Sequence, residues 1–271
     1  MKLTAIYIYP VKSLAGIALQ EAMAGLRGLE HDRRWMLTDM EGVFLTQREF
    51  PEMALLQPSL ENDQLVIRHR TKPLEPLSIS LREADYGEER TVTVWDSVCE
   101  ALHVSEDADQ WFSESLGAPC QLVYMHEDSV RPTDPDYGKA EDMVSFADGY
   151  PFLIIGEAAM NQLNSKLEEP LSIVRFRPNF VFSGGAPHEE DDWKNFSIGA
   201  VQFRGVKRCG RCQIPTIDPE TGIFGKEPLP ALTTYRRFER KLLFGMNVCL
   251  DSSPSMVRVG DLLIVKEKNE L

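Results

Sequence analysis

The sequence is short of positive charge, of cysteine and of long hydrophobic runs, and each shortage excludes a class of protein. Its 271 residues include 29 lysines and arginines against 42 aspartates and glutamates, a net charge of −13. Phosphate backbones repel a chain this acidic, so duplex DNA or RNA is disfavoured as a partner. No stretch approaches the roughly 18 uninterrupted apolar residues of a membrane span, and the first residues contain no apolar signal segment. We therefore expect neither nucleic acid nor a membrane among its partners.

Cysteine is scarce and odd in number. The five cysteines are Cys99, Cys120, Cys209, Cys212 and Cys249. A small secreted module held together by disulfides needs a denser, even set, so the sequence indicates a reducing compartment and we expect a cytoplasmic protein. With 43% apolar and 26% charged residues, the composition is that of an ordinary globular protein. At roughly 150 residues per domain, the length allows one large domain or two smaller ones.

Short apolar segments separated by turn residues predict β structure in most of the chain. In the first half, the expected strands are 3–9, 33–39, 43–47, 65–69, 77–81 and 91–95. Segment 121–125 follows, and the second half adds 179–184, 196–199, 201–206, 212–218, 247–251 and 261–266.

Helical patterns are few. Segment 105–117 has apolar residues at helical spacing, Ser105 as an N-cap and Gly117 as a terminator. Segment 157–167 carries its apolar residues on one face, and 233–243 also fits a helix. The fold class that follows is mainly β with some helices (α+β), built as barrels or sandwiches.

Two β-rich halves are expected, joined near residues 115–130. The polar loop at 131–142 contains prolines and is too long for a simple hairpin connection, which is typical of functional or flexible loops.

The segment VKRCGRC at 206–212 is the most informative local feature. Counting Arg204 just before the segment, four basic residues surround its two cysteines, and no acid occurs between 201 and 212. Positive surroundings stabilise a thiolate, so either Cys209 or Cys212 is expected to be a good nucleophile or soft-metal ligand. Three other interpretations remain open: half of a zinc site, a thioredoxin-like dithiol, or two packed cysteines at a strand end. The dithiol is disfavoured because a strand, not a helix, is expected to follow at 212–218.

Arginines and a lysine elsewhere suggest an anion site. If Arg175 and Arg177 lie on a strand, their side chains share one face and suit bidentate binding of an oxyanion. The alternative is a solvated strand face with ion pairs to the acidic residues 189–192. Lys12 and Ser13 end the first expected strand and form another anion-friendly pair.

Seven motifs together resemble a known family. They are YPVKSLAG (9–16), HDRRWML (31–37), FLTQRE (44–49), SFADGYPFLIIGEAAMNQLN (145–164), RFRPNFVFSG (175–184), DDWKNFSIG (191–199) and KRCGRCQIPTIDPETG (207–222). In this order they resemble the two-domain MOSC proteins, and they are similar to the mitochondrial amidoxime-reducing components and their bacterial counterparts. The resemblance implies a MOSC N-terminal β-barrel domain at 1–118 packed on a MOSC β-barrel domain at 119–271.

The resemblance also implies a molybdenum-pyranopterin cofactor between the two domains. By position, Cys212 resembles the family's molybdenum-coordinating thiolate, and a thiolate suits a thiophilic metal. The residues that resemble contacts to the pterin and its phosphate are Lys12, Ser13, Arg33, Arg177 and Asn179. Gly210 stands where relatives often have serine, so only its backbone amide is expected to reach the cofactor.

The implied activity is that of an oxotransferase that reduces small N-hydroxylated substrates. The chain has no membrane anchor or ferredoxin-like cysteine cluster, so we expect a separate electron-donor protein with a flavin or iron–sulfur centre. Asp148, Asp191 and Asp192 are candidates for proton relay or for contact with cationic amidine-like groups; loop capping is the alternative for each. A different hypothesis is a sulfur carrier, or a protein that handles the cofactor, with a persulfide on Cys212 or Cys209. A third is a barrel protein with neither activity.

Overall fold

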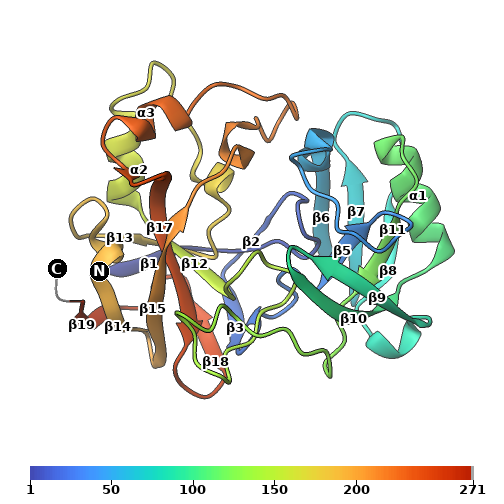
Figure 1. Cartoon of the computed structure of the whole chain (residues 1–271), viewed down its shortest axis with the longest axis horizontal. Helices are drawn as coiled ribbons and strands as arrows, with labels where there is room; N and C mark the ends of the chain where they lie inside the picture. The colour runs from blue at the N-terminus through green and yellow to red at the C-terminus, as the bar shows by residue number, and fades with distance from the viewer. Residues whose placement is uncertain (270–271) are drawn as a thin grey trace.

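The computed structural model describes residues 1–269, which form two halves lying side by side (Figure 1). Strands predominate, and the α-helices of the described chain are short. The predicted α+β class is therefore confirmed. The helices are α1 (Glu106–Leu116), α2 (Glu157–Asn164) and α3 (Leu229–Thr233), and the short 3-10 helices are η1 (Pro51–Leu55), η2 (Glu83–Asp85), η3 (Ile173–Phe176), η4 (Glu189–Asp192) and η5 (Ile214–Thr216).

One half is built on a nine-stranded sheet. Its main path runs β19 (Leu263–Lys268), β14 (Trp193–Ile198), β15 (Val201–Gly210), β17 (Lys241–Leu250), β12 (Phe152–Gly156), β13 (Phe180–Ser183), β1 (Lys2–Ile8) and β2 (Ile17–Leu19), and β16 (Arg237–Phe238) pairs with β17. The pairing of β12 with β13 is parallel, and the other pairs are antiparallel. A small sheet of β18 (Ser255–Arg258), β3 (Glu21–Gly25) and β4 (Gly28–Leu29) closes against it.

Aromatic side chains fill this sheet's interior. Phe152 and Phe180 stack with ring centroids 5.5 Å apart, and Phe203 meets Phe180 edge-on at 5.4 Å. On the other face, Phe176 stacks on Phe244 at 4.2 Å beneath α2 and α3. Strands β12 and β17 are therefore buried on both faces. Because both faces need apolar side chains, the sequences of these two strands are nearly continuous apolar runs.

The other half combines a four-stranded sheet, a three-stranded sheet and α1. The first sheet orders β5 (Trp35–Thr38), β11 (Gln121–Tyr124), β10 (Ser97–His103) and β9 (Glu89–Val94), and the second orders β6 (Leu56–Glu61), β7 (Gln64–His69) and β8 (Leu77–Ser80). The expected caps of α1 are confirmed: Ser105 Oγ accepts the N–H of Ala108 at 3.1 Å, and Gly117 ends the helix at φ +68°.

The sheets exchange segments across the predicted boundary at residue 118. Strand β1 lies between β13 and β2 in the nine-stranded sheet, whereas β11 pairs with β5 and β10 in the other half. In Figure 1, the blue β1 accordingly lies among strands from the second half of the chain. The division into 1–118 and 119–271 stays a prediction, and the two halves are tied together by strand pairing on both sides of it.

Two predicted elements are wrong in the second half of the chain. Segment 212–218 holds the 3-10 helix η5 instead of a strand, because Pro215 has no N–H for a ladder and Thr216 bonds back to the C=O of Gln213. Segment 233–243 is not a helix: α3 ends inside it, and β16 pairs with the start of β17.

One predicted strand is also missing from the first half. Residues 43–47 make isolated bridges only, because the chain turns at Thr46, whose C=O accepts the N–H groups of Glu49 and Phe50. After this turn, Arg48 lies at a pocket between the two halves. Within residues 1–269, none of the helices combines the length and the apolar character needed to cross a membrane.

Candidate functional site

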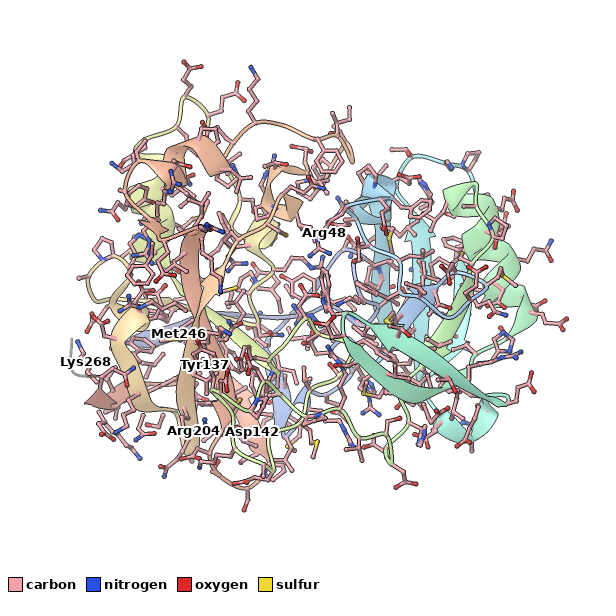
Figure 2. The ribbon with its side chains drawn as sticks, viewed as in Figure 1. Arg48, Tyr137, Asp142, Arg204, Met246 and Lys268 are labelled. Atoms are coloured by element: carbon pink, nitrogen blue, oxygen red, sulfur yellow. The ribbon has the colours of Figure 1, made fainter. Side chains whose placement is uncertain are left out.

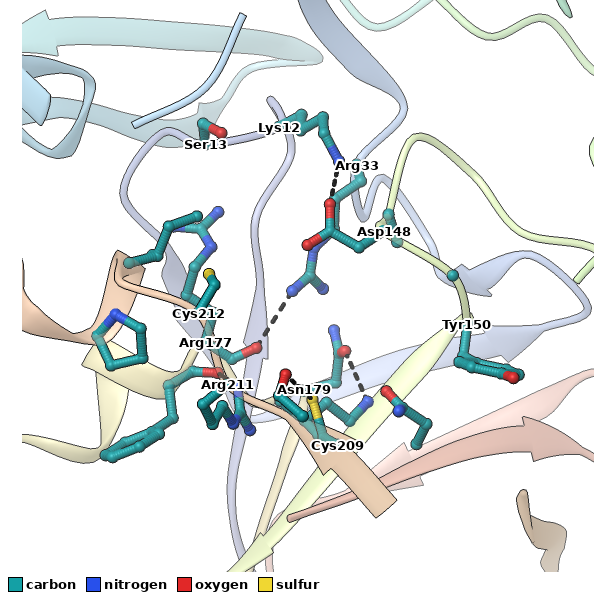
Figure 3. Close-up of a pocket in the computed structure, with 18 of the residues that line it drawn as sticks. Lys12, Ser13, Arg33, Asp148, Tyr150, Arg177, Asn179, Cys209, Arg211 and Cys212 are labelled. Atoms are coloured by element: carbon teal, nitrogen blue, oxygen red, sulfur yellow. Dashed lines mark hydrogen bonds and ion pairs between the residues drawn. The ribbon is translucent and has the colours of Figure 1, made fainter. Parts of the chain in front are cut away.

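A pocket lies where segments of both halves meet, and cations dominate its lining (Figure 3). Its basic lining residues are Lys12, Arg33, Arg48, Arg175, Arg177 and Arg211. Within residues 1–269, the only carboxylate that lines it is Asp148. In a chain of net charge −13, six cations around one cavity are an arrangement suited to an anion.

Lys12 is buried at the pocket, at the end of the segment that follows β1. Its Nζ donates to Asp148 Oδ1 at 2.6 Å and to the C=O of Phe146 at 2.8 Å. Burial lowers the pKa of Lys12 to about 8, although the charge of Asp148 opposes that shift. Lys12 therefore lines the pocket with a charge that depends on pH just above neutrality, and its predicted role as an anion contact stays a prediction.

Asp148 is held as a carboxylate. Partial removal of its carboxyl group from water opposes ionisation. The charge of Lys12 and hydrogen bonds from Lys12 and Trp95 outweigh that effect and bring the pKa of Asp148 well below its usual range. The side chain of Asp148 is 62% exposed to solvent. A carboxylate of this kind accepts hydrogen bonds or contacts cations at neutral pH, and does not store a proton for delivery.

Two arginines flank Tyr9, which is buried. The guanidinium carbons of Arg33 and Arg177 lie 4.3 and 4.1 Å from the centroid of the Tyr9 ring. Arg33 is paired with the buried Asp32, and Arg177 Nη1 donates to the C=O of Leu14 at 2.6 Å. Burial, followed by the charge of Arg33, lowers the pKa of Arg177 to about 10. The aromatic ring thus holds two like charges close together, as an anion site requires.

Backbone strain coincides with these residues. Ser13, Arg33 and Arg177 have φ values of +69°, +51° and +56°, a region that residues other than glycine rarely adopt. All three line the pocket. Such strain is concentrated at functional sites because the surrounding structure must hold it in place.

Asn179 lines the same pocket, but its amide serves the fold. Its Nδ2 donates to Asp32 Oδ2 at 3.0 Å and to the C=O of Tyr7 at 3.1 Å, while Oδ1 accepts the N–H of Leu153 at 3.2 Å. These bonds tie β1, β12 and the Asp32 segment together. Its predicted role as a cofactor contact stays a prediction, and the structure gives it a positioning role as well.

The two cysteines of the CGRC segment differ. Cys212 is exposed (Figure 3), and its Sγ lies 3.7 Å from Nη2 of Arg48. Cys209 is half-buried, and burial raises its pKa in spite of the charge of Arg211. The expectation that either cysteine is activated by its neighbours is therefore wrong for Cys209.

The reason is that most basic residues of the 201–212 run point away from the pocket. Arg204 pairs with Asp142 at 2.8 Å, Lys207 with Asp134 at 3.1 Å and Arg208 with Asp192 at 2.8 Å. Figure 2 shows Arg204 and Asp142 beside each other, away from Arg48. Proximity in sequence to the cysteines did not become proximity in space.

Arg175 and Arg177 do not share a strand face, contrary to expectation. Arg175 lies in η3, and Arg177 follows it in the left-handed conformation. Arg175 Nη2 binds Asp218 at 2.6 Å, so the alternative pairing with residues 189–192 is also wrong. Both arginines still line the pocket.

Sequence reasoning missed Arg48 and Arg211 as pocket residues. Arg48 lies between the two halves (Figure 2). It belongs to the motif FLTQRE, which is part of the family resemblance, and that membership was the available signal for a role of this residue. Arg211 donates to the C=O groups of Phe244 and Phe176 at 2.6 to 3.0 Å and thereby fixes the chain next to Cys212.

The residues fit an anionic group that carries a soft metal. Within residues 1–269, no three His, Cys, Asp or Glu side chains gather as a metal-binding group, so a metal at Cys212 needs further ligands from a bound cofactor. The Cys209–Cys212 pair ends β15 and precedes the three-residue η5, which is not the helix N-terminus of a dithiol site. At Gly210, the nearest atom to an added Cβ is 3.6 Å away in the side chain of Lys241, so no steric contact demands glycine.

Comparison with known proteins agrees with the fold. Residues 1–119 match the MOSC N-terminal beta barrel domain, and residues 141–263 match the MOSC domain. The chain belongs to the family of proteins that join these two domains.

Individual relatives fall into two groups. Mitochondrial amidoxime-reducing component 1 of Homo sapiens is 33% identical over 94% of this chain and 80% of its own length. Molybdenum cofactor sulfurase of Oryza sativa subsp. japonica is 34% identical over 90% of this chain, but over 32% of its own length. The human molybdenum cofactor sulfurase is 31% identical over 98% of this chain and likewise 32% of its own length. The chain thus spans about a third of each of these sulfurases.

Proposed function

We propose that this protein is a molybdenum-cofactor-dependent oxidoreductase that reduces small N-hydroxylated substrates with electrons from a separate protein carrying a flavin or iron–sulfur centre. The observation that carries the proposal is the exposed thiol of Cys212 in a pocket lined by six cations. The similarity to an amidoxime-reducing component over most of both chains supports it. Five free cysteines support a reducing compartment, and we place the protein in the cytoplasm.

The pocket's residues divide into a cation cradle and a ligand. Lys12, Arg33 and Arg177 would hold the phosphate and pterin edge of a molybdenum-pyranopterin cofactor, with Ser13 and the backbone of Gly210 as further polar contacts. Cys212 would supply the protein's sulfur ligand to the metal. When bound, the cofactor supplies two-electron oxygen-atom transfer chemistry.

Arg48 and Asp148 would act on the substrate side. Arg48 would keep the Cys212 thiol oriented at the pocket, because its Nη2 lies 3.7 Å from Sγ. Asp148 stays ionised beside Lys12 and orients a positively charged or hydrogen-bonding substrate group. Lys12 and Asp148 also form the shortest polar link in the pocket between the segment after β1 and the segment before β12.

The test is protein made in a host that synthesises the cofactor. We expect one molybdenum and one pterin per chain, and reduction of an aryl amidoxime to the amidine in the presence of a competent electron donor. Cys212→Ser is expected to lose at least about 99% of this activity, since it removes a metal ligand, while Cys209→Ser serves as the matched control and keeps most of it. Molybdenum-free protein, or a Cys212→Ser variant with unchanged activity, would overturn the proposal.

A sulfur carrier is the second candidate. The exposed Cys212 thiol and the similarity to molybdenum cofactor sulfurases favour it. A persulfide on Cys212 would raise the mass of the intact protein by about 32 Da, the mass of one sulfur atom. That adduct on protein without metal supports the carrier, whereas stoichiometric molybdenum and pterin without the adduct support the oxidoreductase.

A further inference from the structure

Trp95 occupies an unusual position at the edge of the pocket. It is the first residue of the two-residue turn between β9 and β10, with φ +56°. Glycine or asparagine is usual where a hairpin turn takes positive φ, because bulky side chains are strained there. Trp95 is also 44% exposed, so burial of its ring does not explain the strain. Contacts of the Trp95 ring with neighbouring side chains hold this conformation in place.

Three contacts fix the ring. Its Nε1 donates to Asp148 Oδ1 at 3.2 Å, and Phe44 supports it with ring centroids 4.9 Å apart. The guanidinium carbon of Arg48 lies over it, 4.5 Å from the ring centroid. Trp95 and Arg48 come from one half of the molecule and Asp148 from the other, so this arrangement exists only in the assembled protein.

Arg48 occupies the place of a ligand in this arrangement. Its planar cation stacks on Trp95 while Nη2 lies 4.0 Å from Asp148 Oδ2 and 3.7 Å from Cys212 Sγ. Lys12 binds Oδ1 of Asp148, which leaves Oδ2 as the oxygen that faces Arg48. An aromatic face with a carboxylate at its edge is a general way to bind a flat cation.

We propose that Trp95 and Asp148 form a shelf that binds a flat amidinium or guanidinium group of the substrate or product in the place now taken by the Arg48 side chain. This inference rests on the proposed function and assigns the residues that bind the flat cationic part of its substrate or product. Reduction of an N-hydroxyamidine takes two electrons from the donor protein and two protons, breaks the N–O bond and releases water. The resulting amidine then takes up a proton and matches the shelf, next to Cys212.

Binding of benzamidine tests the shelf without any turnover. Isothermal titration of the purified protein is expected to show binding of benzamidine at least tenfold tighter than of benzamide, which has a similar flat shape but no charge. Trp95→Gly removes the ring and suits the positive φ, so the variant is expected to fold and to lose benzamidine binding tenfold or more. Asp148→Asn is expected to abolish the preference over benzamide.

Arg48→Met provides the opposite signature. Removing the competing guanidinium is expected to tighten benzamidine binding several-fold, which a merely structural role for Trp95 does not predict. Equal affinities for benzamidine and benzamide, an unchanged dissociation constant in Trp95→Gly, or weaker binding in Arg48→Met would each overturn the shelf.

The shelf and the proposed function fail separately. If the protein lacks molybdenum and reduces no amidoxime, but benzamidine binding still depends on Trp95, the shelf stands and the proposed function is lost. If the molybdenum enzyme is active and Trp95→Gly raises KM equally for amidine-forming and for neutral N-hydroxylated substrates, the proposed function stands and the shelf is lost.

Discussion

Lys12 illustrates what burial does to a single residue of this pocket. Its Nζ is almost out of solvent, with 6% of the side chain exposed, and its pKa falls to about 8. Its positive charge is complete below that pH and is lost as the pH rises through it. Arg177 keeps its charge at that pH, because its own lowered pKa is about 10.

Anion binding is therefore expected to weaken as the pH rises through about 8. Sulfate is a suitable probe because its own charge does not change in this range. We expect its dissociation constant to increase several-fold between about pH 7 and pH 9, as one cation of the cradle is neutralised. Lys12→Arg, which stays charged, is the matched control and should remove the pH dependence; the same dependence in that variant would refute the assignment to Lys12.

Glu190 is a second buried titratable residue, in η4 and outside the pocket. Its Oε1 accepts the N–H of Gly156 at 3.1 Å, while Oε2 has no partner among residues 1–269. Burial raises its pKa to about 7. A carboxyl whose pKa is higher in the folded than in the unfolded chain stabilises the fold fully below its ordinary pKa, and this stabilisation is lost as the pH rises through about 7.

The free energy of unfolding is thus expected to fall between about pH 4.5 and pH 7. Glu190→Gln should remove that dependence and raise stability at pH 8 by on the order of 2 kcal/mol, because the buried charge is gone while the bond to Gly156 is kept. Urea denaturation at pH 5 and pH 8 measures it. Glu168→Gln, at an exposed position, is the control. A Glu190→Gln variant less stable than the parent at pH 8 would contradict the argument.

At the scale of elements, the paired strands β15 and β17 position Cys212 at the pocket. They are the longest strands of the described chain, and β15 ends at Gly210, two residues before Cys212. Their register shifts between Gly205 and Lys207. At Gly205 a Cβ would lie 2.2 Å from the C=O oxygen of Trp193, so only glycine allows β14 to approach.

Gly205→Ala is accordingly expected to destabilise the protein by about 2–3 kcal/mol, because a backbone atom must move to make room. Gly210→Ser, on the same strand, has nothing closer to its Cβ than 3.6 Å and should unfold at nearly the parent denaturant concentration. Equilibrium denaturation of both variants checks this. Equal stabilities for the two would show that the close approach at Gly205 can relax.

Elements with local signals could be predicted from the sequence, and those decided by distant partners could not. Helix α1 has its start signal in Ser105 and its stop signal in Gly117, and both act as expected. Segment 233–243 has helical spacing, but pairing of β16 with β17 outweighs it, since tertiary contacts add more than helix propensity does. Arg175 and Arg177 reach the pocket from η3 and its end, which no alternation pattern reveals.

At the scale of the whole molecule, charge is segregated. The chain carries −13 overall, yet the pocket lining combines six basic residues with one carboxylate among residues 1–269. We therefore expect the pocket to attract a small anion and the surface as a whole to attract basic macromolecules.

If the electron donor is a basic protein, turnover at low donor concentration should fall several-fold between about 20 mM and 200 mM salt, because ions screen attraction beyond roughly a Debye length. Steady-state rates with a basic and an acidic donor at both salt concentrations test this. The acidic donor is expected to gain or stay constant with salt. A basic donor whose rate ignores salt would show that surface charge does not guide docking.

The sequence by itself determined the class of the fold, the family and the presence of a thiol and cations suited to an anionic, metal-bearing cofactor, because strand alternation, helix caps and motif order are local properties. Only the tertiary structure decided which cations serve the pocket. Of the basic residues near Cys209 and Cys212, three pair with acidic residues: Arg204, Lys207 and Arg208. Arg211 does line the pocket, and the other lining cations come from distant segments: Lys12, Arg33, Arg48, Arg175 and Arg177. Electrostatic energy depends on distance in space, and the packing of the two halves sets that distance.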